Sequence, residues 1–213
     1  MPVKAKICGI THPEALDAAV TGGARYIGLV FFAKSPRNIS PPMAAELARM
    51  VPTGVRTVGL FVDPDDAFLD HVLGQVPLDM VQLHGNETPE RVAAIRARHG
   101  LPVIKALKVE TATDLDAAAA YEPVVDMLLF DAKPPRDSVL PGGNGVAFDW
   151  TLLTGRSWAK PWMLSGGLTP DTVAEAVRIS GATAVDVSSG VEDRPGHKDP
   201  ALIRAFLDAV RNA

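Results

Sequence analysis

The stretch KICGI, Lys6–Ile10, closes the first apolar run of the chain and contains its only cysteine, Cys8. The run predicts a strand over residues 3–8. The segment that follows, from about Pro13 to Val20, has the apolar period of a helix and is ended by two glycines. A strand followed by a helix makes one βα unit, and the rest of the chain repeats this unit.

Seven further short apolar segments alternate with longer segments of helical period. The predicted strands are Tyr26–Phe32, Thr57–Val62, Met80–Leu83, Val103–Leu107, Met127–Phe130, Trp162–Leu164 and Ala184–Val187. The predicted helices are Pro41–Met50, Asp63–Leu73 with Asp63 as its cap, Pro89–Arg98, Ala112–Ala120, a short turn after Trp150, a helix from near Pro170, and Pro200–Val210.

These strands are apolar almost throughout, which suits parallel strands covered by helices, because parallel strands need crossovers and are buried on both faces. A doubly wound sheet usually stops at five or six strands and carries a glycine-rich fingerprint after its first strand, where this chain has only Gly9. We therefore predict an α/β fold, a single-domain (β/α)8 TIM barrel of eight parallel strands over residues 1–213.

The composition excludes several classes of protein. A net charge of −4 gives no long-range attraction to nucleic acid or to an acidic membrane surface. One cysteine rules out an internal disulfide and a cysteine-rich metal site. Neither a leader peptide nor an apolar run of membrane-spanning length is evident. We expect a cytoplasmic protein without nucleic-acid or membrane partners and without a metal.

Two loops at strand ends predict a phosphate site. They follow the seventh and eighth strands and contain Ser165, Gly166 and Gly167 in one and Ser188, Ser189 and Gly190 in the other. Barrels of this class often bind phosphate at these two loops, where glycine lets backbone N–H groups approach an anion and serine adds a donor. Either loop alone is more simply explained as a tight turn, but their joint position favours a phosphorylated small molecule.

Strand alternation points Cys8 into the barrel. Val3, Ala5 and Ile7 share an apolar face that suits the helix layer, which leaves Lys6 and Cys8 facing inward. A lone cysteine is more often a small buried apolar residue than a reagent. Its pKa shift has no predictable sign, because a neighbouring ammonium and a bound phosphate act in opposite directions.

An inward ammonium also needs a countercharge. Asp186 lies on the eighth strand, which neighbours the first in a closed barrel. We expect Asp186 to pair with Lys6, chiefly as structural support.

Three further strand endings carry polar side chains. Asp131 closes the sixth strand, where a carboxyl group can act as a general acid or cap a nearby loop. Arg37, after the second strand, can grip a carboxylate or phosphate through its planar fork, the alternative being a solvated surface arginine. His84, in the stretch QLHG, can donate to a ligand or bond a neighbouring loop, and the second role is slightly favoured.

Eight stretches in this order resemble the phosphoribosylanthranilate isomerase family of tryptophan biosynthesis. They are KICGI, KSPRNIS, GLFV, QLHG, LLFDAKPP, PGGNGVAFDW, LSGGL and AVDVSSGVE followed by PGHKD. The resemblance implies a cofactor-free Amadori rearrangement of N-(5-phosphoribosyl)anthranilate to 1-(2-carboxyphenylamino)-1-deoxyribulose 5-phosphate. The expected partner is thus this small-molecule substrate, and the expected state is a monomer or homodimer.

By the same resemblance, Asp131 would protonate the furanose ring oxygen and Cys8 would remove the C2′ proton. Arg37 would meet the anthranilate carboxylate and His84 would contact the substrate. The phosphate would lie against Gly166, Gly167, Ser188, Ser189 and Gly190.

Two positions depart from the family pattern. Asn38 stands where an aromatic residue is frequent and could alter packing around the anthranilate ring. Asn144 stands where Thr or Ser is common and could alter loop closure.

Two other functions stay open. A histidine-pathway isomerase would use aspartates as acid and base, so Cys8 argues against it, and no second phosphate loop is evident. A non-catalytic phosphate-binding barrel would keep the phosphate loops without needing both Cys8 and Asp131.

Overall fold

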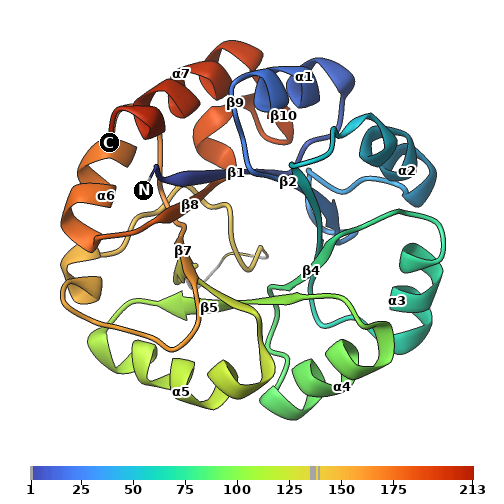
Figure 1. Cartoon of the computed structure of the whole chain (residues 1–213), viewed down its shortest axis with the longest axis horizontal. Helices are drawn as coiled ribbons and strands as arrows, with labels where there is room; N and C mark the ends of the chain where they lie inside the picture. The colour runs from blue at the N-terminus through green and yellow to red at the C-terminus, as the bar shows by residue number, and fades with distance from the viewer. Residues whose placement is uncertain (1, 135–137, 139) are drawn as a thin grey trace.

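Eight parallel strands close into a barrel in their order along the chain, with β8 pairing back onto β1. The structure is a computed structural model that describes residues 2–134, 138 and 140–213, so Pro135 of the LLFDAKPP stretch lies outside the described residues. Figure 1 shows the helices arranged as a ring around the strands. The predicted fold class is confirmed.

The strands closely follow the predicted segments. They are β1 (Lys4–Cys8), β2 (Tyr26–Phe31), β3 (Arg56–Phe61), β4 (Met80–Leu83), β5 (Val103–Val109), β6 (Met127–Ala132), β7 (Trp162–Leu164) and β8 (Ala184–Val187). A two-stranded hairpin of β9 (Glu192–Arg194) and β10 (His197–Lys198) follows β8. The sequence pattern indicated only a charged, glycine-containing loop there.

Most helices begin where the sequence indicates. They are α1 (Pro13–Thr21), α2 (Pro41–Met50), α3 (Asp66–Leu73), α4 (Pro89–His99), α5 (Ala118–Tyr121), α6 (Val173–Ser180) and α7 (Pro200–Arg211). Short 3-10 helices are η1 (Ala112–Ala117), η2 (Glu122–Val124), η3 (Trp150–Leu153) and η4 (Ser189–Val191). Proline in the first turn of α1, α2, α4 and α7 fits these starts, because the first N–H groups of a helix need no intrahelical acceptor.

Three helix predictions were wrong in detail. The cap of α3 is Asp65, whose carboxylate accepts a hydrogen bond from the N–H of Phe68. The carboxylate of Asp63 instead accepts from the N–H of Asn86 in the next loop. The segment near Pro170 is a turn, and α6 starts at Val173. The alanine-rich segment is 3-10 helix up to Ala117 before it becomes α-helical.

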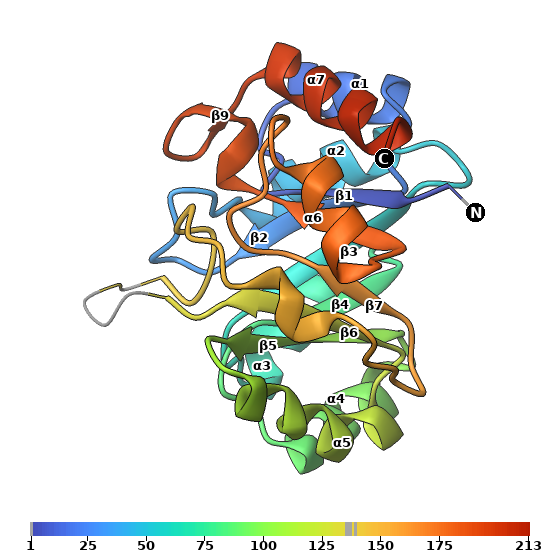
Figure 2. The same ribbon diagram turned by 90° about the vertical axis from the view of Figure 1, so that its left-hand side faces the viewer.

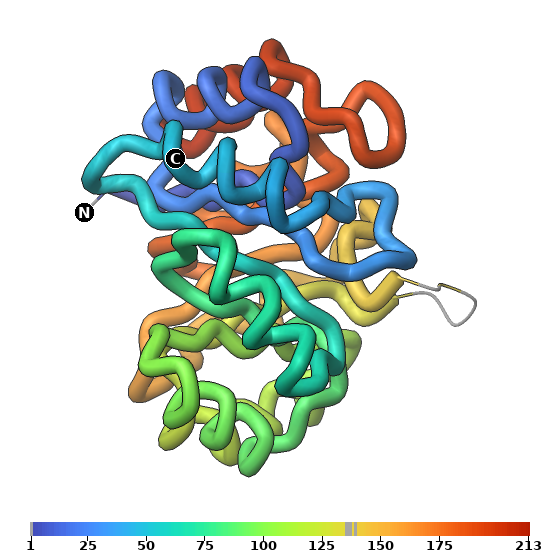
Figure 3. Tube along the Cα trace, turned by 90° about the vertical axis from the view of Figure 1, so that its right-hand side faces the viewer, coloured from blue at the N-terminus to red at the C-terminus, as the bar shows by residue number. Residues whose placement is uncertain are grey.

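The barrel interior is apolar toward the strand starts and polar toward the strand ends. Met80, Ile104, Leu129 and Met163 belong to an interior cluster, whereas Ile7 packs in the larger core under the helices. This confirms the predicted alternation along β1. Figures 2 and 3 show the loop after β2, the connection after β6 and the β9–β10 hairpin projecting on the same side of the molecule.

Among the described residues, no helix combines the length and the apolar character needed to cross a membrane.

Candidate active site

A pocket of about 760 Å³, counted out to its open mouth, lies at the ends of the strands. Its lining includes every predicted site residue except Lys6: Cys8, Arg37, His84, Asp131, Gly166, Gly167, Asp186, Ser188, Ser189 and Gly190. Barrel closure thus gathers side chains that are spread over the whole sequence.

Lys6 lies beneath the pocket and forms the predicted ion pair. Its Nζ donates to Oδ1 of Asp186 at 2.8 Å, and neither side chain is exposed by more than 4%. Burial lowers the pKa of Lys6, but the charges of Asp186 and of the Cys8 thiolate outweigh it and raise that pKa to about 12. The hydroxyl of Ser165 donates to the second oxygen of Asp186 at 3.2 Å. Asp186 therefore joins β1 to the loop after β7.

The Cys8 thiol is buried beside the Lys6 ammonium. A Cβ added at Gly28 of β2 would lie 2.9 Å from the Cys8 Sγ and 3.1 Å from the Lys6 Nζ, so only glycine leaves room for both groups. Burial raises the pKa of Cys8, and the charge of Lys6 lowers it by less, so that the net shift is upward.

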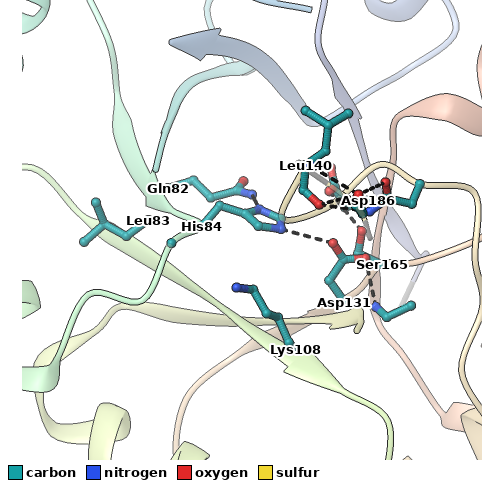
Figure 4. Close-up of polar contacts among 12 residues, drawn as sticks. Gln82, Leu83, His84, Lys108, Asp131, Leu140, Ser165 and Asp186 are labelled. Carbon is teal, nitrogen blue, oxygen red and sulfur yellow. Dashed lines mark hydrogen bonds and ion pairs between the residues drawn. The ribbon is translucent and has the colours of Figure 1, made fainter. Parts of the chain in front are cut away.

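Asp131 faces the pocket from β6 and is held by two N–H groups (Figure 4). The backbone N–H of Ala132 donates to Oδ1 at 3.0 Å, and His84 Nε2 lies 3.1 Å from Oδ2. The side-chain Nε2 of Gln82 lies 2.9 Å from His84 Nδ1, and an amide N–H donated there would place the imidazole proton on Nε2. His84 thus bonds the proposed acid instead of the neighbouring loop that the sequence favoured.

The glycine-rich connection after β6 covers this pair. A Cβ at Gly142 would lie 2.5 Å from both Asp131 Oδ2 and His84 Nε2. Asn144 shapes the same connection, because its side chain accepts from the Ser138 hydroxyl at 2.7 Å and donates to the Leu140 carbonyl at 3.2 Å. Asn38, in contrast, is exposed and does not line the pocket.

Arg37 is buried, with 6% of its surface exposed, and is therefore not a solvated surface arginine. Its Nε and Nη2 donate to the two carboxylate oxygens of Glu192 at 2.7 and 2.9 Å, and Nη2 also donates to the Gly143 carbonyl at 3.2 Å. One edge of its planar fork is therefore occupied by acceptors of the protein itself. Glu192 and its second partner Lys198 lie in the SSGVE and PGHKD stretches, but nothing in the sequence connects them to Arg37.

The two predicted phosphate loops lie side by side. Gly166 and Gly167 have φ values of +90° and +67°, a backbone conformation that favours glycine. A side chain at Gly190 would collide with the Leu168 carbonyl, so the two loops touch backbone to backbone. The Ser188 hydroxyl donates to the Cys8 carbonyl at 3.1 Å, which joins β8 to β1.

An apolar wall borders Cys8 on the side of β2 and β3. Val30 and Leu60 pack with Cys8, and Phe32 and Val62 pack against them. All four line the pocket. The pocket thus combines two loops rich in glycine and serine, an apolar wall, a thiol and a carboxyl group.

In the part of the chain that the structure describes, no group of three or more His, Cys, Asp or Glu side chains could hold a metal ion.

The chain is similar to known proteins over nearly its whole length. A family model described as N-(5'phosphoribosyl)anthranilate (PRA) isomerase matches residues 5–209. A Rhodospirillum centenum protein named N-(5'-phosphoribosyl)anthranilate isomerase is 70% identical over 208 residues, 97% of each chain.

Two solved structures are similar as well. The phosphoribosyl anthranilate isomerase of Thermotoga maritima has a TM-score of 0.88 at 38% identity, covering 99% of this chain and 100% of that one. A second structure of such an isomerase, in complex with reduced 1-(o-carboxyphenylamino)-1-deoxyribulose 5-phosphate, has a TM-score of 0.84 at 36% identity with the same coverage.

Proposed function

The chain belongs to the N-(5'-phosphoribosyl)anthranilate isomerase family, and on this premise we propose that Cys8 and Asp131 are the base and the acid of its reaction. The protein is an isomerase of tryptophan biosynthesis. It converts N-(5'-phosphoribosyl)anthranilate to 1-(2-carboxyphenylamino)-1-deoxyribulose 5-phosphate.

The reaction begins at the furanose ring. Asp131, in its protonated form, gives its proton to the ring oxygen as the C1′–O bond breaks, and the anilino nitrogen forms a Schiff base at C1′. The N–H of His84 then stabilises the carboxylate that is left behind. The thiolate of Cys8 removes the C2′ proton to give an enolamine, which tautomerises to the aminoketose.

One observation carries this assignment. Cys8 and Asp131 face the same pocket, which also contains the phosphate cradle and the apolar wall beside Cys8. A phosphate held by the cradle and an aromatic ring against the wall would place the ribose between the two groups. The remaining Arg37 Nη1 edge would meet the ring carboxylate.

The test is to separate binding from turnover in Cys8→Ala and Asp131→Asn. We expect each change to lower turnover by about 10² to 10⁴, or about 3 to 5.5 kcal/mol. The affinity for reduced 1-(o-carboxyphenylamino)-1-deoxyribulose 5-phosphate should change little. Turnover is followed by the fluorescence of freshly made substrate, without added metal or nucleotide.

Asp126→Asn serves as the control, because Asp126 precedes β6 and pairs with Arg96 away from the pocket. Near-native turnover in either site variant would remove that residue from the mechanism. Loss of analogue binding together with turnover would favour a structural role.

A cytoplasmic location, a single domain over residues 1–213, and a monomeric or homodimeric state without nucleic-acid or membrane partners stay predictions.

A further inference from the structure

We propose that Glu192 is a positioning residue for substrate recognition, which fixes the guanidinium of Arg37 so that its Nη1 edge meets the ring carboxylate. The inference rests on the proposed function, in which Arg37 contacts that carboxylate. Glu192 would act through Arg37 without touching the substrate.

The carboxylate of Glu192 has no spare capacity for a ligand. Oε1 accepts from Arg37 Nε at 2.7 Å and from Lys198 Nζ at 2.5 Å. Oε2 accepts from Arg37 Nη2 at 2.9 Å and from the Gly196 N–H at 3.2 Å. With two donors on each oxygen, the group is saturated by the protein.

Two basic side chains, Arg37 and Lys198, share the single carboxylate of Glu192, and all three side chains are at most 7% exposed. Burial lowers the pKa of Lys198. Lys198 is saturated by Glu192 and by the carbonyl and hydroxyl of Ser188. Among the described residues, no hydrogen bond engages Arg37 Nη1. Arg37 lines the pocket, and Nη1 is the guanidinium nitrogen that the protein leaves for a ligand.

The surroundings keep this edge in one place. A Cβ at Gly9 would lie 2.9 Å from Arg37 Cδ, and one at Gly143 would lie 2.7 Å from Nη1, so the side chain is held between two backbone segments. The backbone at Gly196 packs against the Pro36 carbonyl, which brings the hairpin onto the loop that carries Arg37. A guanidinium fixed in this way loses little conformational entropy when it binds a carboxylate.

The competing explanation is that Glu192 only anchors the β9–β10 hairpin. In that case its loss would weaken all ligands alike and would do so whether or not Arg37 is present. Two probes distinguish these explanations: reduced 1-(o-carboxyphenylamino)-1-deoxyribulose 5-phosphate, and its analogue that lacks only the ring carboxylate.

The experiment measures the affinity of both probes for the native protein, Glu192→Gln, Arg37→Ala and the double variant. We expect Glu192→Gln to weaken the carboxylate probe about tenfold and the other probe less than twofold, with KM rising and kcat changing little. In the Arg37→Ala background, Glu192→Gln should have less than a twofold effect, since the two residues act as one unit.

The control is Asp193→Asn, which removes the same charge from the same hairpin at a half-exposed side chain that pairs with His197. It measures the general gain in anion affinity that loss of a negative charge brings. If Glu192→Gln does not fold, Glu192→Asp keeps the charge but withdraws it by one methylene. That variant should weaken the carboxylate probe about threefold.

Three results would overturn the inference: unchanged binding in Glu192→Gln, equal loss for both probes, or a tenfold effect that persists without Arg37. If Arg37→Ala itself fails to discriminate the probes, the role proposed for Arg37 is wrong and the inference falls with it. If Arg37→Ala discriminates them but Glu192→Gln does not, only the role of Glu192 is wrong.

Discussion

Lys6 and Asp186 act on the Cys8 thiol in opposite directions. The ammonium of Lys6 favours the thiolate, whereas the carboxylate of Asp186 and the burial of the site disfavour it. An unperturbed thiol with a pKa near 8.5 is only about 3% thiolate at pH 7. An upward shift makes that fraction smaller, so with Cys8 as the proposed base we expect the charge next to it to affect the rate.

We predict that Lys6→Met lowers kcat/KM by about 10- to 100-fold and moves its high-pH limb to higher pH. The reason is that loss of a neighbouring positive charge raises the pKa of the thiol. Asp186→Asn should move the limb to lower pH, although both variants break the same ion pair. The measurements are the pH profile of kcat/KM and the pH dependence of thiol alkylation.

Lys4→Met is the matched control, because Lys4 is exposed and lies on the same strand. It should leave the profile unchanged. If Lys6→Met and Asp186→Asn shift the limb in the same direction, the ion pair affects Cys8 only through structure.

One buried carboxylate, that of Glu87, joins the ends of β3 and β4 to a lysine within β5. Glu87 accepts through Oε1 from the N–H groups of Asp63 and Gly85 at 2.9 and 3.0 Å, and Lys105 of β5 donates to Oε2 at 2.6 Å. Lys105 also donates to the Gly85 carbonyl at 2.8 Å. Since Gly85 directly follows His84, this network fixes the backbone next to His84, which in turn contacts the proposed acid Asp131.

We predict that Lys105→Met destabilises the protein by about 3 to 5 kcal/mol, because it leaves the Glu87 carboxylate buried and unpaired. The double variant with Glu87→Gln should regain part of this loss. Urea denaturation of the single and double variants measures both effects. Arg178→Met, which breaks an exposed pair with Glu175, should cost less than about 1 kcal/mol. Equal costs in Lys105→Met and in the double variant with Glu87→Gln would argue against the network.

At the scale of the whole molecule, buried ionised carboxylates make stability depend on pH. Burial raises the pKa of Glu87 and of Glu192, but the charges and hydrogen bonds of their cationic partners outweigh it, and both values are lowered. The unfolded chain then binds more protons than the native protein between the lowered and the ordinary pKa values. Stability is therefore complete above the ordinary glutamate value and is lost as the pH falls through the lowered ones.

We predict that the free energy of unfolding falls steeply below about pH 4.3, the ordinary pKa of glutamate. Urea denaturation at a series of pH values measures the slope. The Glu87→Gln, Lys105→Met double variant should show a shallower slope, because one of the shifted groups is gone. An unchanged slope would show that Glu87 is not among the groups responsible.

The site residues that could be predicted from the sequence lie at the ends of strands. Cys8, Asp131, Gly166 and Ser188 could each be placed at the pocket because parallel strands in a barrel present their last residues to one mouth. The Lys6 and Asp186 pair was predictable for a related reason, since β8 must neighbour β1 in a closed barrel. The cap of α3 is Asp65 and not the predicted Asp63. This difference shows the limit of local signals, because either aspartate could cap the helix.

Local sequence patterns were sufficient to predict the succession of strands and helices, the inward direction of Cys8 and the position of the two loops rich in glycine and serine. Apolar period, proline, glycine and strand alternation act between near neighbours, so they can be read locally. The contacts of Glu192 with Arg37, 155 residues away, and of His84 with Asp131 became evident only in the folded barrel. Barrel closure and the burial of charge determine which side chains become partners. Local sequence patterns do not report either of these effects.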